Sequence, residues 1–396
     1  MSLFAGAELA PADPILGLTE ALRRDERTDK VNLGVGVYLD ESGTLPLMAA
    51  VREAQERIVA EQAPHGYLPI DGLPAYREQV RSLALGDEAL DRVATMQSLG
   101  GTGALKLGAD LLRQLHPTST VLISDPSWEN HRALFTRAGF HVERYRYYDA
   151  EARAIDVDGM LDSLRGAPEG AVVVLHACCH NPTGYDLSDE QWDRMIEVLG
   201  ERGLFPFVDM AYQGFGAGLE EDGAVVRKLL ATGTPFLLST SYSKTFGLYG
   251  QRTGALHAVA ADADEARRVL SQLKICARTN YSNPPTFGAK VVATVLGDGE
   301  LRQTWEQELQ HMRERIASLR TQLVGALGEH GVDDMAFIAE QRGMFSYTGL
   351  SAAQMQGLRE EHGIYGTDAG RICVAAMNDD NLPRIAEAVA RVRAGE

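Results

Sequence analysis

The sequence predicts an α/β fold built around a mostly parallel β-sheet. Short apolar runs rich in valine, isoleucine and phenylalanine alternate with amphipathic helical patterns through the middle of the chain. The last three of these runs begin roughly 30 residues apart with helices between them, which is the spacing of right-handed βαβ units. The expected strands are 120–124, 171–177, 204–209 and 235–240, and the helices between the later ones are 189–202 and 223–231.

The C-terminal part of the chain has a different pattern. Apolar residues at helical spacing predict one helix over 301–329, which is longer than an ordinary globular helix and is expected to lead from one domain into another. Beyond it the sequence predicts strands at 344–347 and 371–374 and a closing helix at 381–392. Such a mixture is typical of an α+β domain.

The charge of the chain excludes two classes of partner. The 396 residues include 55 acidic and 38 basic side chains, so the formal net charge is −17. Nucleic acids and anionic membrane surfaces are polyanions, which such a protein would repel. A small anionic substrate would need a locally positive pocket, and arginine is the residue to expect there.

The cysteines and histidines give no sign of a metal site. Four cysteines occur without CxxC spacing, and the spacing of His176 and His180 lacks the glutamate of HExxH. Reduced thiols in a cytoplasmic protein are therefore expected, with no bound metal. The first residues lack the basic stretch and apolar core of a secretory signal, and no apolar run approaches the roughly 20 residues of a membrane span.

Polar residues follow three successive predicted strands. Asn181 lies in a His-Asn-Pro-Thr-Gly turn, Asp209 and Tyr212 follow the next strand, and Lys244 follows the third. Each has an ordinary explanation: a turn signal, a helix N-cap for Asp209, and a solvated loop charge for Lys244. Because ligands collect at the carboxyl ends of parallel strands, these residues together predict a single crevice that contains an amide, a carboxylate, a phenol and an amine.

A glycine-rich turn at 99–104 adds a phosphate site to this crevice. It opens a helical pattern, so its backbone N–H groups and the helix dipole can hold a phosphate, although small residues also serve tight turns. The chain has no GxxxxGK[ST] motif, and this turn is not a GxGxxG. A phosphate site, a carboxylate for a pyridine nitrogen and an imine-forming lysine suit pyridoxal phosphate.

These residues resemble the fold-type I pyridoxal-phosphate aminotransferases of subclass Iα, which are the aspartate and aromatic amino acid aminotransferases. The most specific matches are at 32–38, 178–184 and 241–244, and the resemblance extends from 11–16 to 370–374. It implies a large domain with a mostly parallel seven-stranded sheet flanked by helices, plus a smaller α+β domain. Two other possibilities stay open: a different pyridoxal-phosphate reaction, such as decarboxylation or β-elimination, and a noncatalytic protein on this scaffold.

The resemblance implies a role for each residue around the cofactor ring. Lys244 would bond to the cofactor as an imine and shuttle the proton between Cα and C4′. Asp209 would pair with the pyridine nitrogen, and Trp128 would stack on the ring with His131 behind Asp209. Two further residues would hydrogen-bond the ring oxygen, namely Tyr212 and Asn181. The residues expected at the phosphate are Gly101, Thr102, Ser241, Ser243, Arg252 and the partner's Tyr67.

Two arginines would bind the substrate carboxylates in this family. Arg371 matches the arginine that binds the α-carboxylate, and Arg278 matches one that crosses the dimer to a distal carboxylate. A planar guanidinium suits both bidentately. The other residues expected to contact substrate are Gly36, Trp128, Asn181, Leu16 and Phe345.

The resemblance also implies domain boundaries and a homodimer. Residues 1–12 would form an arm that contacts the partner subunit. Residues 13–45 and 312–396 would form the small domain, and residues 46–311 the large domain that binds pyridoxal phosphate. The active sites would be shared across the dimer interface.

The choice of amino acid depends on the lining of the pocket. Leu39, Leu45 and Gly66 stand where aspartate-specific members usually have polar or basic residues, which favours an apolar side chain. Thr102 and Asn283 match the aspartate-type choice. We therefore expect a ping-pong aromatic amino acid aminotransferase that transfers the amino group of tyrosine or phenylalanine, and also of aspartate, to 2-oxoglutarate. Aspartate aminotransferase is the alternative.

Overall fold

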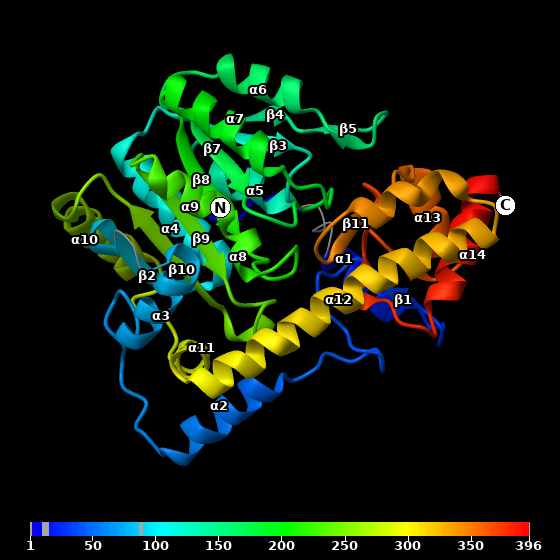
Figure 1. The fold of residues 1–396 in the computed structure, drawn as a ribbon, viewed down its shortest axis with the longest axis horizontal. Coiled ribbons are helices and arrows are strands. Elements are labelled where there is room, and N and C mark those ends of the chain that lie inside the picture. Colours follow the sequence, from blue (N-terminus) through cyan, green and yellow to red (C-terminus); the bar gives the residue numbers. More distant parts are fainter. Residues whose placement is uncertain (1, 10–15, 87–89, 396) are drawn as a thin grey trace.

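The computed structural model describes residues 2–9, 16–86 and 90–395, and its centre is a seven-stranded sheet (Figure 1). The strands lie in the order β2-β10-β9-β8-β7-β3-β4. Strand β10 is antiparallel to both of its neighbours, and the other pairs are parallel. The strands are β2 (Val93–Leu99), β3 (Thr120–Asp125), β4 (His141–Arg146), β7 (Val172–His176), β8 (Phe205–Met210), β9 (Phe236–Ser241) and β10 (Thr253–Val259).

Helices cover both faces of this sheet because its central strands are apolar on both sides. In β7, Val172 and Val174 pack into the core on one face, and Val173 and Leu175 pack into the core on the other. This alternation follows from the two-residue period of a strand. One face carries α4 (Gly100–Leu115), α5 (Glu129–Arg137) and α10 (Ala263–Asn280), and the other carries α3 (Pro74–Leu85), α6 (Val157–Arg165), α7 (Asp189–Glu201) and α9 (Ala224–Ala231).

The predicted α/β class and the four strands predicted for this sheet are confirmed, and no strand end differs from the prediction by more than one residue. The mostly parallel seven-stranded sheet that the resemblance implied is also present. Strands β2, β4 and β10 were not among the strands read directly from the sequence pattern. The other helices and strands between residues 49 and 297 are α2 (Ala49–Ala60), α8 (Leu219–Asp222), α11 (Phe287–Gly297), β5 (Tyr148–Asp149), β6 (Ala154–Ile155), η1 (Leu90–Arg92) and η2 (Tyr249–Gln251).

One long helix, α12 (Gly299–Glu329), runs from α2 and α11 at one end to the C-terminal elements at the other (Figure 1). It begins two residues before the predicted start because the Asp298 side chain accepts the N–H groups of Glu300 and Leu301. The elements around its far end are α1 (Leu16–Arg24), β1 (Val31–Asn32), η3 (Asp333–Glu340), β11 (Phe345–Tyr347), α13 (Ala352–Glu360), β12 (Ile364–Tyr365), β13 (Arg371–Cys373), η4 (Val374–Ala376) and α14 (Leu382–Ala394).

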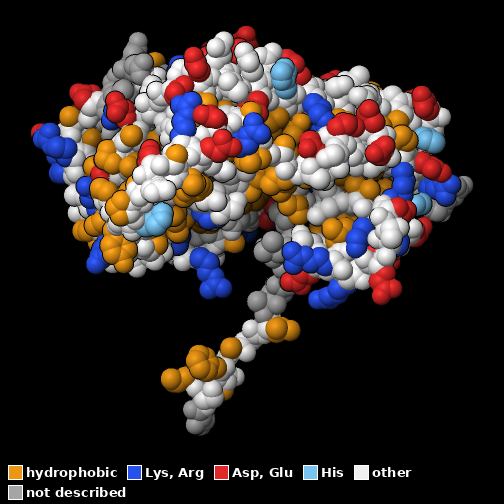
Figure 2. Space-filling model, turned by 90° about the horizontal axis from the view of Figure 1, so that it is seen from below, with side chains coloured by type: hydrophobic (Ala, Val, Ile, Leu, Met, Phe, Trp, Pro, Cys, Tyr) orange, Lys and Arg blue, Asp and Glu red, His pale blue; other side chains and the backbone are white. Residues whose placement is uncertain are grey.

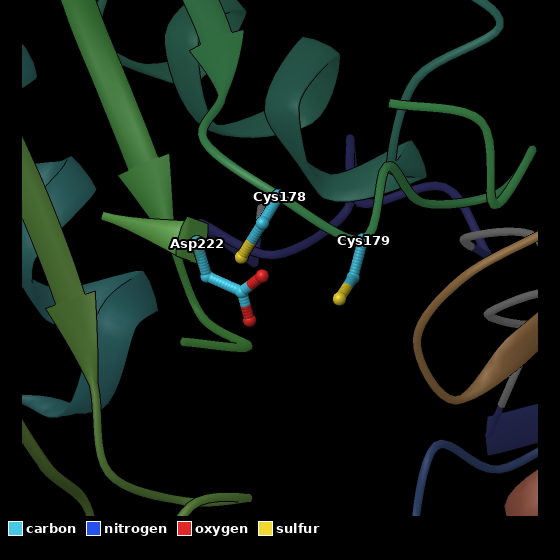
Figure 3. Close-up of side chains that lie close together, drawn as sticks. All are labelled: Cys178, Cys179 and Asp222. Carbon is cyan, nitrogen blue, oxygen red and sulfur yellow. The ribbon is translucent and has the colours of Figure 1, made fainter. Parts of the chain in front are cut away.

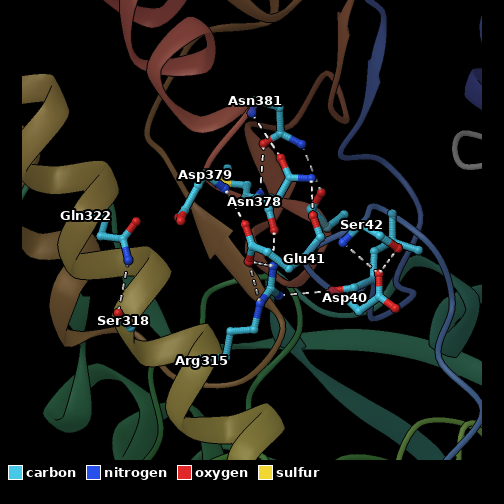
Figure 4. A network of polar contacts seen from close by, with 12 residues as sticks. Asp40, Glu41, Ser42, Arg315, Ser318, Gln322, Asn378, Asp379 and Asn381 are labelled. Atoms are coloured by element: carbon cyan, nitrogen blue, oxygen red, sulfur yellow. Dashed lines mark hydrogen bonds and ion pairs between the residues drawn. The ribbon is translucent and has the colours of Figure 1, made fainter.

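The N-terminal segment joins these C-terminal elements. Strand β1 pairs in parallel with β12, and β11 pairs antiparallel with β13. Figure 4 shows a network of polar contacts around Arg315 of α12. In this network Arg315 forms an ion pair with Glu41 at 3.0 Å. Arg315 also donates to the carbonyl oxygens of Leu39 at 3.0 Å and Met377 at 2.8 Å. These contacts agree with a small domain of residues 13–45 and 312–396, and that division stays a prediction.

The helices carry no membrane-spanning signal. Within residues 2–9, 16–86 and 90–395, no helix has the length and apolar character needed to cross a bilayer.

Candidate active site

The carboxyl ends of β7, β8 and β9 meet the start of α4 at a cavity of about 460 Å³. Most of the residues expected at the cofactor and the substrate line this cavity, although they come from widely separated parts of the chain. The expected residues in its wall are Gly36, Gly101, Thr102, Trp128, Asn181, Asp209, Tyr212, Ser241, Ser243, Lys244, Arg252, Phe345 and Arg371.

Lys244 lies three residues beyond the end of β9, and its amine faces into the cavity. Its Nζ lies 4.8 Å from the centroid of the Tyr212 ring. Burial lowers the pKa of Lys244 to about 8; Asp209 opposes this shift, and Arg252 and Arg371 add to it. A lysine with this pKa has a substantial neutral fraction near pH 8, which is the form that attacks a carbonyl group.

Asp209 lies within β8 and is not the helix N-cap that its position after an apolar run allowed. His131, which is fully buried, donates from Nε2 to the carboxylate at 3.0 Å, and Ser127 lies 2.9 Å from the other ring nitrogen. Burial alone would raise the pKa of Asp209, but the His131 hydrogen bond and the nearby positive charge of Lys244 outweigh it, so the pKa lies below its usual value. Asp209 is therefore a buried carboxylate that is kept ionised.

The start of α4 forms an anion-binding corner of the cavity. Gly101 and Thr102 lie in the first turn of this 16-residue helix, and that turn contains no acidic residue. A Cβ on Gly101 would lie 3.2 Å from Cβ of Ser241, so the small residue lets the helix approach β9 closely. Arg252 donates to Tyr249 O at 2.9 Å and lies at the same corner. Backbone N–H groups, hydroxyls and a guanidinium together suit a phosphate.

Arg371 forms the opposite wall and has an unused donor. It is 1% exposed, donates from Nη1 to Asn181 Oδ1 at 3.1 Å and from Nη2 to Gly34 O at 2.9 Å. Its Nε is buried and has no hydrogen-bond partner among the residues that the structure describes. The Phe345 ring centroid lies 4.2 Å from its guanidinium carbon. Within the described part of the chain, this buried guanidinium has an unpaired N–H and no ion-paired carboxylate, which suits an anionic ligand.

Two expected site residues, Tyr67 and Arg278, are not brought to this cavity by the chain on its own. Tyr67 is 96% exposed, and Arg278 is an exposed residue at the end of α10 that contacts Ser282. Leu16 begins α1, but its side chain lies outside the described residues. The apolar positions at 39, 45 and 66, on which the substrate choice depended, are also absent from the lining.

The cavity includes residues that the sequence did not single out for the site. His176 is the last residue of β7 and pairs in register with Asp209. Burial lowers the pKa of His176 to about 3, with His131 adding to the shift, so its imidazole is neutral. The sequence could have indicated His176 by its position at the end of the strand next to the strand of Asp209. The other such residues in the lining are Val35, Val37, Cys178, Ala211 and Tyr249.

Two thiols and a carboxylate converge beside the cavity (Figure 3). One potential ligand atom from each of Cys178, Cys179 and Asp222 lies within 4.8 Å of the others. The Asp222 carboxylate already accepts backbone N–H groups from Gly214 and two neighbouring residues at 2.7–2.9 Å. The pKa values of both thiols are raised, by the hydrogen bond between them and by burial for Cys178, and mainly by burial for Cys179. The cluster is therefore explained by loop anchoring and packing.

Comparison with known proteins places this site in a family. The model of "Aminotransferase class I and II" matches residues 28–389. The chain is 54% identical to an aspartate aminotransferase of Pseudomonas aeruginosa, covering 99% of the chain and 100% of the relative. It is 48% identical to an aromatic-amino-acid aminotransferase of Escherichia coli, covering 98% and 100%. The chain belongs to the class I and II aminotransferase family.

A solved structure agrees over the same length. The crystal structure of an aromatic-amino-acid aminotransferase from Burkholderia pseudomallei, covalently bound to pyridoxal phosphate, is 56% identical to the chain. It superposes with a TM-score of 0.96 and covers 99% of this chain and 100% of that one.

Proposed function

We propose that this aminotransferase transfers the amino group of an aromatic amino acid, tyrosine or phenylalanine, to 2-oxoglutarate, with aspartate as a further donor. The observation that carries the proposal is one cavity that holds the buried amine of Lys244, the ionised Asp209 and the unpaired donor of Arg371. Amino acids and 2-oxo acids share an α-carboxylate for Arg371. The two substrates would bind in turn, in a ping-pong sequence.

The residues of the cavity fit pyridoxal phosphate. The corner at Gly101, Thr102 and Arg252 suits the phosphate, Asp209 suits a protonated pyridine nitrogen, and Lys244 suits the aldehyde. When bound, this cofactor supplies an aldehyde that takes up the amino group and a ring that withdraws electrons from the bond being broken. The Burkholderia pseudomallei structure holds the same cofactor covalently.

Five residues of the cavity wall would then take part in the chemistry. Lys244 would take the proton from Cα of the amino acid and deliver it to C4′ of the cofactor. Asp209, with His131 behind it, would keep the proton on the pyridine nitrogen. Burial raises the pKa of Tyr212, so its phenol stays protonated and can donate a hydrogen bond together with Asn181. Trp128 would cover one face of the ring and exclude water.

The aromatic preference rests on residues 39, 45 and 66, and aspartate aminotransferase remains the second candidate. The relative from Pseudomonas aeruginosa and the match at Thr102 and Asn283 favour that candidate. Measuring kcat/KM for phenylalanine, tyrosine and aspartate with 2-oxoglutarate decides between them. We expect the aromatic substrates to equal or exceed aspartate, and a large aspartate preference would make the second candidate correct.

The active sites would be completed in a homodimer. Tyr67 and Arg278 are exposed in the single chain, as are the large apolar side chains of Leu47, Val59 and Ile275. Figure 2 shows orange side chains among the charges on one face of the molecule. A partner subunit that covered these side chains would remove their apolar area from water, which favours association. The exposed Leu3, Phe4 and Leu9 suit the predicted arm.

We also place the protein in the cytoplasm. All four cysteines are free, and three of them are buried. Thiols stay reduced in that compartment, so free cysteines there are ordinary.

Arg278→Leu is expected to separate the two classes of substrate. In the amino acid half-reaction, kcat/KM for aspartate should fall about 10²- to 10³-fold because its distal carboxylate loses a bidentate partner. The value for phenylalanine should change less than about threefold, since its side chain has no charge to pair. Stopped-flow absorbance of the cofactor during single turnovers measures both values. Equal losses for the two substrates would contradict the assignment.

Mixed dimers test whether Arg278 acts across the interface. Lys244→Ala and Arg278→Leu subunits are mixed, unfolded and refolded together. If each site takes Lys244 from one chain and Arg278 from the other, the hybrid contains one intact site, and aspartate activity returns. If Arg278 serves its own chain, no hybrid site is intact, and the mixture stays as inactive toward aspartate as its parents.

A further inference from the structure

A second arginine lies behind the cavity wall and does not face the cavity. Arg320 projects from α12, is 3% exposed, and forms no ion pair with any residue that the structure describes. Its Nη2 donates to the carbonyl oxygens of Gly343 and of Phe345, the latter at 2.8 Å. Its Nε donates to Ser346 Oγ at 3.3 Å. One guanidinium therefore fixes three acceptors at the start of β11.

Burying a guanidinium at this position costs more free energy than burying an apolar side chain there would. Burial lowers the pKa of Arg320 to about 10, which reflects the free-energy cost of keeping a cation away from water. An apolar side chain of similar volume usually fills such a space at lower cost. The planar guanidinium does hold its neighbours in one geometry, because its donors fix the direction as well as the distance of their acceptors.

The segment that Arg320 fixes carries the ring that packs against Arg371. Phe345 lies over the Arg371 guanidinium at 4.2 Å and meets the Tyr212 ring edge-on at 6.2 Å. A Cβ on Gly36 would lie 2.5 Å from Cζ of Phe345, so the ring fills the space beside that glycine completely. Phe345 therefore has little freedom to move unless the backbone of β11 moves with it.

Arg371 is held on three sides but not on the fourth. Asn181 and Gly34 accept its two Nη groups, Phe345 covers one face, and Nε is left for a ligand. The aromatic face attracts the cation and sets the plane of the guanidinium. A carboxylate needs that plane aligned to accept two hydrogen bonds at once.

We propose that Arg320 is a positioning residue, which sets the affinity of the enzyme for α-carboxylates by fixing Phe345 over Arg371. The proposal deepens the function proposed above and rests on it. Arg320 touches neither the substrate nor the cofactor in this arrangement. It acts through the backbone of residues 343–346, and displacements of this kind are sufficient to change rates and affinities strongly.

The test measures binding of 3-phenylpropionate, a monocarboxylate that cannot be transaminated, to the cofactor-loaded enzyme by calorimetry. Arg320→Met is expected to raise its Kd about 10-fold, because Phe345 no longer fixes the plane of Arg371. The matched control is Arg302→Met on the same helix, a partly exposed arginine paired with Glu306 at 2.9 Å, and its Kd should equal that of the wild type. The pH midpoint of the cofactor absorbance should be unchanged in both variants.

A double-mutant cycle with Phe345→Ala separates positioning from general loosening of the fold. If Arg320 acts through Phe345, Arg320→Met should change Kd less than about twofold once the ring is absent. An equal 10-fold rise in both backgrounds would overturn the proposal, and so would an unchanged Kd in folded Arg320→Met. If Arg320→Met does not fold, Arg320→Lys, which keeps the charge and loses the fork, enters the same cycle with the same two criteria.

The two proposals fail in different ways. Absence of transamination by the wild type would remove the proposed function, whatever the cycle shows. Normal transamination with an additive cycle would remove only the role of Arg320.

Discussion

Lys244→Ala is expected to abolish transamination, with kcat lower by at least about 10⁴-fold. The reason is that, in the proposed function, one amine would supply both the covalent link to the cofactor and the proton transfer at Cα. The other described lysines lie outside the cavity lining, so none replaces it. Borohydride reduction followed by mass spectrometry of the denatured protein checks the covalent link. The wild type should retain the cofactor mass on the peptide that contains residue 244, and the variant should retain none.

The free energy of unfolding is the control for Lys244→Ala, because it shows whether the variant loses activity by unfolding. Burial has lowered the pKa of Lys244 from 10.5 to about 8, so keeping the folded chain protonated there costs about 3 kcal/mol at neutral pH. This penalty is fully present below pH 8 and is relieved as the pH rises from 8 to 10.5. The cofactor-free variant should therefore be at least as stable as the cofactor-free wild type at pH 7.

Two outcomes would contradict the assignment of Lys244. One is a cofactor that stays covalently attached in Lys244→Ala. The other is a comparable loss of kcat in Lys290→Ala, since Lys290 forms an ion pair with Glu61 at 3.4 Å away from the cavity.

The residues that follow the strands of the sheet could be predicted because topology alone brings them together. Once 171–177, 204–209 and 235–240 read as parallel neighbours, Asn181, Asp209 and Lys244 had to lie at one edge. Arg371 had no such signal among the many arginines of the chain. Only the resemblance to a family selected it, and the structure then placed it in the cavity wall.

Other features depend on contacts that no local pattern records. All seven residues of β10 are buried, and they mix glycine, threonine and histidine with apolar residues, so neither a continuous apolar run nor alternation marks the strand. Arg320 lies in a helical pattern where arginine normally indicates a solvated face. Its acceptors lie 23–26 residues further along the chain, so no pattern within the helix records the contact.

Charge is distributed unevenly in the protein. The chain carries a net charge of −17, yet the described residues of the cavity wall include Lys244, Arg252 and Arg371 and a single carboxylate, Asp209. These groups make a small positive region inside an acidic molecule, which suits a phosphate and an α-carboxylate at once. The net charge that excludes polyanions therefore does not exclude small anions.

Arg371→Leu is expected to lower kcat/KM for every amino acid by about 10²- to 10⁴-fold, because the α-carboxylate loses a buried, charge-assisted partner. Phenethylamine, which is phenylalanine without its carboxylate, is the matched control substrate. Its much slower reaction should change less than about threefold, since it makes no contact that the substitution removes. The ratio of the two kcat/KM values, measured by single-turnover absorbance, should therefore collapse toward one.

The phenethylamine control also covers the structural cost of the substitution. Leucine leaves Asn181 Oδ1 and Gly34 O without their donors, so a loss of about 1–3 kcal/mol in stability is expected. If that loss also disturbed the geometry of the cavity, the rates with both substrates would fall alike, whereas loss of the carboxylate contact lowers only the rate with phenylalanine. Equal losses would show that Arg371 supports the cavity wall without binding the carboxylate. A selective loss would leave Nε, the donor without a partner among the described residues, as part of the site that the carboxylate occupies.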